Sequence, residues 1–265
     1  MSYTTLEFTV TDGIGRIRLN RPDRLNAMSL EMIEEVCDVL DKCAADAKVR
    51  CVMFTGTGRG FCAGADLSSL SERTRQADGR VDVGDSMDRL FNPMIRKIRG
   101  LEKPVIAAVN GVAAGGGANL ALACDIVVAA RSARFDQAFV RISLIPDLGG
   151  TWFLPHMVGD ARARALAMLG TSVPAEQAQA WGMIWQVVDD AALEAEATAL
   201  AKRLADGPTL ALGSIKKAIN AAHTNDLSAQ LDMERDLQRD LGRSADFAEG
   251  VTAFLQKRPA KFAGR

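Results

Sequence analysis

The sequence predicts an α/β fold that is followed by a helical C-terminal region. Apolar runs typical of buried strands recur in the first part of the chain, at 49–55, 104–109 and 126–130. Helical patterns separate these runs, and such alternation is typical of a sheet with parallel crossovers. Beyond Asp206-Gly207-Pro208 the patterns are only helical. We therefore expect an α/β core at 1–205 and a helical region at 206–265.

The first elements are predicted to be a hairpin and a capped helix. Residues 3–11 and 14–19 alternate apolar and polar side chains on either side of Asp12-Gly13, which is typical of a β-hairpin. Ser29 is a candidate N-cap, because a helical pattern begins directly after it. The apolar side of this pattern carries Met32, Ile33, Val36, Val39 and Leu40.

The central part of the chain combines a long loop with several helices. Residues 68–85 are polar and mixed in charge, which predicts a long loop or a lid. A helix is expected at 87–99, with an interruption near Pro93. Further helical patterns occur at 118–124, from 151 onward, at 160–169 and at 175–181.

The C-terminal region carries apolar side chains that need a partner surface. Helical patterns cover 210–222, 227–241 and 245–255. Leu227, Leu231, Leu237 and Leu241 recur at helical spacing and form one stripe. Such a stripe must pack on the core or on a second chain.

Composition and charge argue against several classes of protein. The chain has 265 residues, 48% of them hydrophobic, and its 32 Lys and Arg against 33 Asp and Glu give a net charge of -1. Without a basic excess we expect neither a nucleic-acid nor a membrane partner, and no apolar run approaches the ~18 residues of a membrane helix. Two histidines, and five cysteines without a CxxC pair, argue against a metal site and a disulfide framework. No secretory signal is visible, so we expect a cytoplasmic protein.

Two glycine clusters are candidates for binding sites. Gly56-Thr57-Gly58-Arg59-Gly60 follows a strand, but the third glycine of a dinucleotide fingerprint would fall on Phe61. Gly115-Gly116-Gly117 lies between a buried strand and a helix. This run exposes N–H groups at the positive end of a helix dipole, which suits an anion or a developing oxyanion. The alternative is that the glycines permit close packing of the helix on the strand.

The segments 61–67 and 110–117 together resemble the signature of the enoyl-CoA hydratase/isomerase (crotonase) superfamily. Similar segments extend this resemblance over the whole chain, at 21–27, 145–151 and 254–258. The resemblance implies a crotonase/ClpP-like spiral of ββα units with a C-terminal helical region that builds trimers, often paired into hexamers. It also implies an acyl-CoA substrate and no separate cofactor, because coenzyme A is part of the substrate.

The resemblance assigns binding roles residue by residue. The N–H groups of Ala65 and Gly116 match the two donors that hold the thioester oxygen, and each such donor contributes ~3 kcal/mol to a transition state. The residues implied to contact coenzyme A are Arg24, Leu25, Ala63, Asp66, Leu67, Ser68 and, reaching a neighbouring subunit, Lys257. Alternatives remain for two of them: Asp66 as a brace of its loop, and Lys257 as a solvated charge.

The chain departs from the family at both positions where hydratases carry a glutamate. These positions match Asn119 and Phe139. Addition of water to a double bond needs one group to activate the water and an acid to protonate carbon. Neither residue can exchange a proton, so hydration is disfavoured. We expect Phe139 to line the substrate site and Asn119 to orient a substrate group by hydrogen bonding.

One carboxylate remains at a family catalytic position, and it is Asp147. In the isomerase branch of the family an aspartate at this position faces the acyl chain, and the Trp-rich stretch at 181–185 resembles the same branch. The apolar residues expected to desolvate Asp147 and raise its pKa are Phe139, Ile142, Leu144 and Trp152, and its neighbours Ile145 and Leu148 add to this apolar setting. The alternative is a turn aspartate, which is common beside Pro and Gly.

The resemblance therefore implies an isomerase of acyl-CoA thioesters. The expected reactions are conversion of 1,2-epoxyphenylacetyl-CoA to oxepin-CoA, conversion of 3-enoyl-CoA to 2-enoyl-CoA, or both. A hydratase and a non-catalytic acyl-CoA-binding homologue are the alternatives. A peptidase is disfavoured, because no Ser-His-Asp spacing is convincing.

Overall fold

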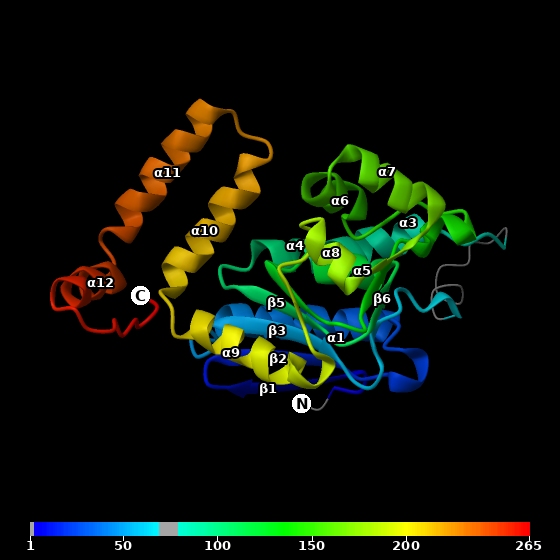
Figure 1. Cartoon of the computed structure of the whole chain (residues 1–265), viewed down its shortest axis with the longest axis horizontal. Helices are drawn as coiled ribbons and strands as arrows, with labels where there is room; N and C mark the ends of the chain where they lie inside the picture. Colours follow the sequence, from blue (N-terminus) through cyan, green and yellow to red (C-terminus); the bar gives the residue numbers. More distant parts are fainter. Residues whose placement is uncertain (1–2, 69–78) are drawn as a thin grey trace.

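A six-stranded sheet is the largest element of the computed structural model, which describes residues 3–68 and 79–265 (Figure 1). Its strands lie in the order β1-β2-β3-β5-β7-β10. Their bounds are Leu6–Thr11, Ile14–Leu19, Cys51–Gly56, Val105–Val109, Ile126–Ala130 and Gln186–Val188. β1 and β2 pair antiparallel, and every other neighbouring pair is parallel. The predicted hairpin and the predicted parallel crossovers are therefore confirmed.

A second, four-stranded sheet lies in the order β4-β6-β8-β9. Its strands have three residues each, at Gly60–Cys62, Val112–Ala114, Arg134–Asp136 and Ser172–Pro174. β4, β6 and β8 directly follow β3, β5 and β7 of the large sheet. This repetition agrees with the expected spiral of ββα units. The sequence did not predict these strands, because three residues are too few for a recognisable alternation.

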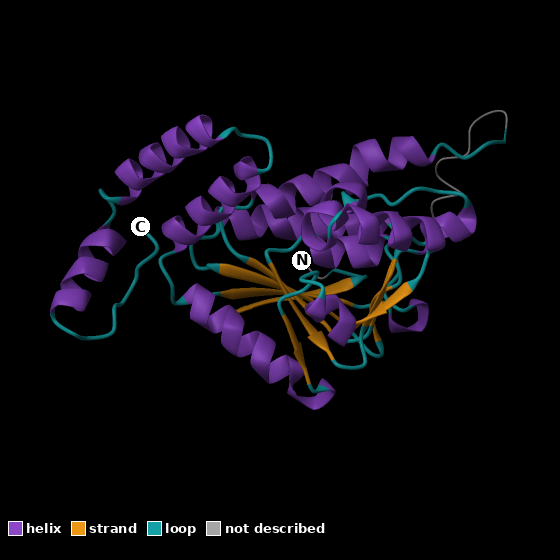
Figure 2. Cartoon of the chain, turned by 45° about the horizontal axis from the view of Figure 1, so that its top comes forward, coloured by secondary structure: helices purple, strands orange, loops and turns teal. Residues whose placement is uncertain are grey.

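Helices cover both faces of the large sheet (Figure 2). The helix α1 (Leu30–Ala45) packs on β1 and β2, and α9 (Leu193–Ala205) packs on β2, β3, β5 and β7. The predicted N-cap of α1 is confirmed, because the Ser29 hydroxyl accepts a hydrogen bond of 3.2 Å from the N–H of Met32. The five predicted apolar residues of α1 are all buried.

The remaining core helices are α3 (Val83–Ser86), α4 (Asn92–Gly100), α5 (Gly116–Leu122), α6 (Gly150–Val158), α7 (Asp160–Leu169) and α8 (Ala175–Ala180). Short 3-10 segments occupy Pro22–Arg24, Ala138–Ile142 and Asp190–Ala192. The interruption expected near Pro93 lies earlier, as a π-helical stretch at Met87–Phe91, and Pro93 sits in the first turn of α4, where proline is tolerated. Of the predicted loop at 68–85, residues 69–78 lie outside the described part of the chain.

Three helices form a C-terminal arm that extends to one side of the core (Figure 1). They are α10 (Thr209–Ala222), α11 (Leu227–Leu241) and α12 (Ala245–Leu255). A buried ion pair attaches α10 to the core: Lys216 Nζ lies 3.0 Å from the carboxylate of Asp125 and donates to the carbonyl oxygen of Ile98 at 2.7 Å. The first helix of the arm, α10, is therefore packed against the core.

The outer helices of the arm expose apolar side chains. α11 buries none of its residues, and Leu227 and Leu231 are 74% and 54% exposed. Of the predicted apolar stripe, Leu227 and Leu231 are therefore exposed, whereas Leu237 and Leu241 are half-buried. Among residues 3–68 and 79–265, no helix is long and apolar enough to cross a membrane. The same residues contain no cluster of three or more His, Cys, Asp or Glu that could hold a metal ion.

Candidate active site

Two turns of main chain meet at glycines in the centre of the candidate site. Gly64, in the turn after β4, has a φ of +94°, a left-handed value that favours glycine. A Cβ on Gly64 would lie 2.8 Å from the carbonyl oxygen of Ala114 and 3.3 Å from the nitrogen of Gly116. A Cβ on Gly117 would lie only 2.1 Å from the carbonyl oxygen of Cys62. Close packing, the alternative interpretation of the glycine run, therefore accounts for Gly117.

The two N–H groups of the predicted oxyanion site have no acceptor within the described residues. No backbone hydrogen bond is donated by the N–H of Ala65 or of Gly116. Met28 pairs with Ala65 in a parallel bridge, but its hydrogen bonds go to Gly64 and Asp66. Gly116 is the first residue of α5, and N–H groups in a first turn have no partner inside the helix. Both groups can therefore donate to an oxygen atom of a bound molecule.

An ion pair braces the turn that carries Ala65. The Asp66 carboxylate lies 2.8 Å from Nη2 of Arg21 and accepts a hydrogen bond of 2.6 Å from the Ser68 hydroxyl. Burial opposes ionisation of Asp66, but these bonds outweigh burial and lower its pKa to about 2. The carboxylate is therefore ionised at neutral pH and tied to its own loop. This arrangement fits the alternative interpretation of Asp66 as a brace.

The other residues expected at coenzyme A lie near this turn, apart from one. Leu25 adopts a left-handed φ of +49°, and its carbonyl oxygen accepts a hydrogen bond of 3.0 Å from the N–H of Ala63. Three of the expected residues expose their side chains, namely Arg24, Leu67 and Ser68. Lys257 is exposed directly after α12, and Figure 1 shows α12 remote from α5. Its contact with ligand on a neighbouring subunit stays a prediction.

Asp147 lies beside Gly116 and is half-buried. From the position that a Cβ on Gly116 would occupy, Asp147 Oδ1 is 3.5 Å away, Leu148 Cδ1 is 3.4 Å away and Met28 Cε is 3.1 Å away. Oδ1 is buried and has no hydrogen-bond partner among the described residues. Burial raises the pKa of Asp147 to about 7, although its own backbone N–H opposes the rise. Such a carboxyl can accept and release a proton near neutral pH.

The apolar residues expected around Asp147 differ in their exposure. Three expected neighbours are substantially exposed, with values of 50%, 38% and 38% for Ile142, Leu144 and Trp152. Trp152 contacts the two histidines of the chain instead, with ring centroids 4.6 Å and 4.7 Å away. Met28 and Leu148 are buried, and each places an atom within 3.5 Å of the same position beside Gly116 that Asp147 Oδ1 approaches. The expected direction of the pKa shift agrees with the structure, and the side chains that cause it stay a prediction.

The residues at the two hydratase glutamate positions both lie against the glycine run or the Asp147 turn. The Phe139 ring is buried, with an atom 3.7 Å from the position of a Cβ on Gly115. Asn119 is fully buried on α5. Its Nδ2 donates to the carbonyl oxygen of Asp147 at 2.8 Å, and its Oδ1 accepts from Gln137 at 2.9 Å. The structure corrects the role expected for Asn119, because its amide binds protein groups and faces no open site.

Sequence reasoning missed two residues at this site. Met28 lies against Gly116, and Gln137 holds the Asn119 amide. Gln137 lies two residues before Phe139, a predicted site residue, so its position was a usable signal. Met28 had no such signal, because it reaches the site only through its bridge with Ala65.

Replacement of Asp147 by Asn should stabilise the chain at high pH. The pKa of about 7 in the folded state exceeds the ordinary value of 3.8, so the wild-type chain loses stability as the pH rises from about 4 to above 7. Asn carries no charge to bury. In thermal unfolding we expect Asp147→Asn to raise Tm by several degrees at pH 8 and to leave it unchanged at pH 4.

The control for this measurement is Asp88→Asn, at an exposed position, which should leave Tm unchanged at both pH values. Equal Tm values for Asp147→Asn and the wild type at pH 8 would contradict an uncompensated buried carboxylate.

The chain is similar to known proteins over nearly its whole length. A 1,2-epoxyphenylacetyl-CoA isomerase of Escherichia coli is 54% identical over 257 residues, which are 97% of each chain. A Rhodobacter capsulatus protein named "Probable enoyl-CoA hydratase" is 45% identical over the whole of both chains. The crystal structure of an enoyl-CoA hydratase from Bacillus anthracis superposes with a TM-score of 0.92 at 32% identity, covering 99% of this chain and 100% of that one. Residues 9–265 match the enoyl-CoA hydratase/isomerase family, and the chain belongs to that family.

Proposed function

We propose that this chain isomerises acyl-CoA thioesters, with 1,2-epoxyphenylacetyl-CoA as its principal substrate and oxepin-CoA as the product. The observation that carries the proposal is the carboxyl group of Asp147, whose Oδ1 is buried beside Gly116, a residue whose N–H has no acceptor among the described residues. The identity of 54% to the Escherichia coli isomerase supports the choice of substrate. Conversion of 3-enoyl-CoA to 2-enoyl-CoA is the second reaction that the same groups can perform.

The proposed mechanism separates charge stabilisation from proton transfer. The N–H groups of Ala65 and Gly116 hold the thioester oxygen, where negative charge develops when a proton leaves the adjacent carbon. For a 3-enoyl chain, Asp147 removes a proton from C2, the double bond shifts, and the carboxylic acid returns the proton to C4 on the same face. The epoxide rearrangement draws on the same stabilisation of an enolate-like state. Both reactions conserve the atoms of the substrate.

A hydratase is disfavoured by the same geometry. Neither Asn119 nor Phe139 supplies a second acid, and Asn119 is occupied by its bonds to Gln137 and Asp147. A non-catalytic binding protein is also disfavoured, because it would have no need for a buried carboxyl that destabilises the fold at neutral pH.

The Asp147→Asn variant should lose turnover and keep substrate binding. A general base contributes ~10²–10⁴-fold to rate, so we expect a loss of this size in kcat, with little change in affinity. In the wild type the rate should rise with pH through about 7, because the ionised carboxyl is the base. Absorbance of the product measures turnover, and calorimetry measures acyl-CoA binding.

Wild-type turnover in this variant would refute the assignment of Asp147 as the base. Simultaneous loss of binding and activity would favour the turn aspartate, whose removal misfolds the site.

Hydration of crotonyl-CoA should be slow or absent, because the chain lacks a second acid. Mass spectrometry separates the two reactions, since isomerisation conserves mass and hydration adds one water. A panel of acyl-CoA thioesters would show which chain is rearranged fastest. Hydration at a rate comparable to isomerisation would mean that another residue supplies the second acid.

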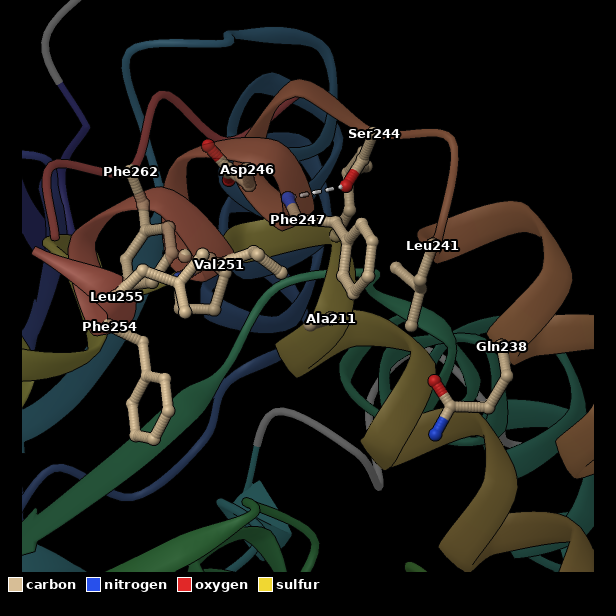
Figure 3. A pocket seen from close by; sticks show the side chains of 13 residues that line it. Ala211, Gln238, Leu241, Ser244, Asp246, Phe247, Val251, Phe254, Leu255 and Phe262 are labelled. Carbon is tan, nitrogen blue, oxygen red and sulfur yellow. Dashed lines mark hydrogen bonds between the residues drawn. The ribbon is translucent and has the colours of Figure 1, made fainter.

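We infer that the chain assembles into trimers, or into dimers of trimers, through its C-terminal arm. An apolar cavity of about 430 Å³ opens between α10, α11 and α12. Figure 3 shows the rings of Phe247, Phe254 and Phe262 around it. Phe254 is 83% exposed and Leu255 is 74% exposed, and exposed apolar patches of this kind mark association surfaces.

Light scattering should therefore give a mass that is a multiple of three subunits. A monomer at micromolar concentration would contradict this assembly.

A further inference from the structure

Asn119 is completely buried and connects two parts of the candidate site. Its Nδ2 donates to the carbonyl oxygen of Asp147 at 2.8 Å, and its Oδ1 accepts from Gln137 Nε2 at 2.9 Å. It lies on α5, the helix whose first residue, Gly116, provides one of the two free N–H groups. One side chain therefore joins the helix that binds the oxyanion to the turn that carries the carboxyl.

The Asn119 amide is one of two donors to the carbonyl oxygen of Asp147. The carbonyl oxygen of Asp147 accepts a second hydrogen bond, of 2.8 Å, from the N–H of Gly150. The next residue, Leu148, is held at a φ of +49°, which is unfavourable for a side chain of its kind. The Asp147 Oδ1 atom has no partner in the described chain, so no other side chain fixes the carboxyl there. Its direction is set by the main chain.

Gly150 leaves the space that the Asn119 amide occupies. A Cβ on Gly150 would lie 2.2 Å from Asn119 Nδ2 and 2.7 Å from its Cγ. The φ of Gly150 is not in the left-handed region, so backbone conformation does not require glycine there. The requirement comes from the amide. Asn119 and Gly150 are thus two sides of one contact, and either can be changed to break it.

We propose that Asn119 is a positioning residue, which aims the Asp147 carboxyl at the substrate by holding the Asp147 carbonyl through its amide. The role assigned to Asp147 rests on the proposed function. Asn119 itself touches no substrate, because it is fully buried and its amide is bonded on both sides. At the position where hydratases carry an acid, this chain thus uses an amide to orient a different acid.

Loss of the contact has a specific consequence for Asp147. A looser turn lets the carboxyl move from its buried position toward water, and better solvation of the charged form lowers its pKa from about 7. A displacement of about 1 Å from the reacting atoms can lower a rate by about 10²-fold. Acyl-CoA binding at the N–H groups of Ala65 and Gly116 is affected much less.

The test uses Asn119→Ala and Gly150→Ala, which break the same contact from opposite sides. Both variants should lower kcat by about 10–100-fold with KM within about threefold, and both should shift the pH midpoint of the rate downward. The control is Leu122→Val, on the same helix and equally buried. It should lower Tm without moving the pH midpoint, as a merely structural change would. Gly150→Ala retains the Asn119 amide in the core. If Asn119→Ala does not fold, Gly150→Ala alone can therefore be used for the test.

A second measurement needs no turnover. The difference in Tm between each chain and its Asp147→Asn counterpart, followed against pH, reports the ionisation of Asp147 directly. We expect its midpoint to fall below that of the wild type in the Asn119→Ala and Gly150→Ala backgrounds. Unchanged midpoints in both backgrounds, or a raised KM with unchanged kcat, would overturn the positioning role. Absence of isomerisation by the wild type would overturn the proposed function instead, and the Tm measurement would still decide the role of Asn119.

Discussion

The close approach of two backbones at Gly64 and Gly117 is the constraint on which the site depends. A Cβ at either position would collide with a carbonyl oxygen, at 2.8 Å and 2.1 Å respectively, and would separate the turn after β4 from α5. Two side-chain amides bind the start of β4: Nδ2 of Asn26 and Nδ2 of Asn110 donate to the carbonyl oxygen of Gly60 at 2.7 Å and 3.2 Å. Within the described residues, this packing leaves the N–H groups of Ala65 and Gly116 without an acceptor.

Two carboxyl groups of the site differ in pKa because their surroundings differ. Asp66 is bonded to Arg21 and Ser68, and its pKa falls to about 2, whereas burial without such bonds raises the pKa of Asp147 to about 7. A fixed charge therefore braces the loop, while a group that can exchange a proton sits next to Gly116. Surroundings that give two carboxyl groups such different pKa values are typical of acid–base sites. An ionised Asp147 destabilises the folded chain, because its buried Oδ1 has no compensating partner among the described residues.

Charged side chains attach the C-terminal arm to the core, and the outer helices of the arm expose apolar side chains. Arg50 donates to the carbonyl oxygens of Gly207 and Phe262, so the start and the end of the arm meet at one side chain. Lys216 and Asp125 form a second attachment inside the core. Breaking a buried pair of this kind by removing one partner typically costs ~3–5 kcal/mol. An arm that is firmly attached to the core and exposes apolar side chains on its outer helices is consistent with association through the arm.

The sequence by itself determined the larger elements and the family. The hairpin, the Ser29 cap and the buried strands follow from local alternation and capping, which act over a few residues. Ala65 and Gly116 were predicted as donors from their motifs, and among the described residues their N–H groups have no acceptor. Tertiary structure alone decided the three-residue strands, the burial of Asp147 Oδ1, and the bond from Asn119 to the Asp147 carbonyl. These features join segments far apart in the chain, and burial of a side chain depends on what other segments place over it.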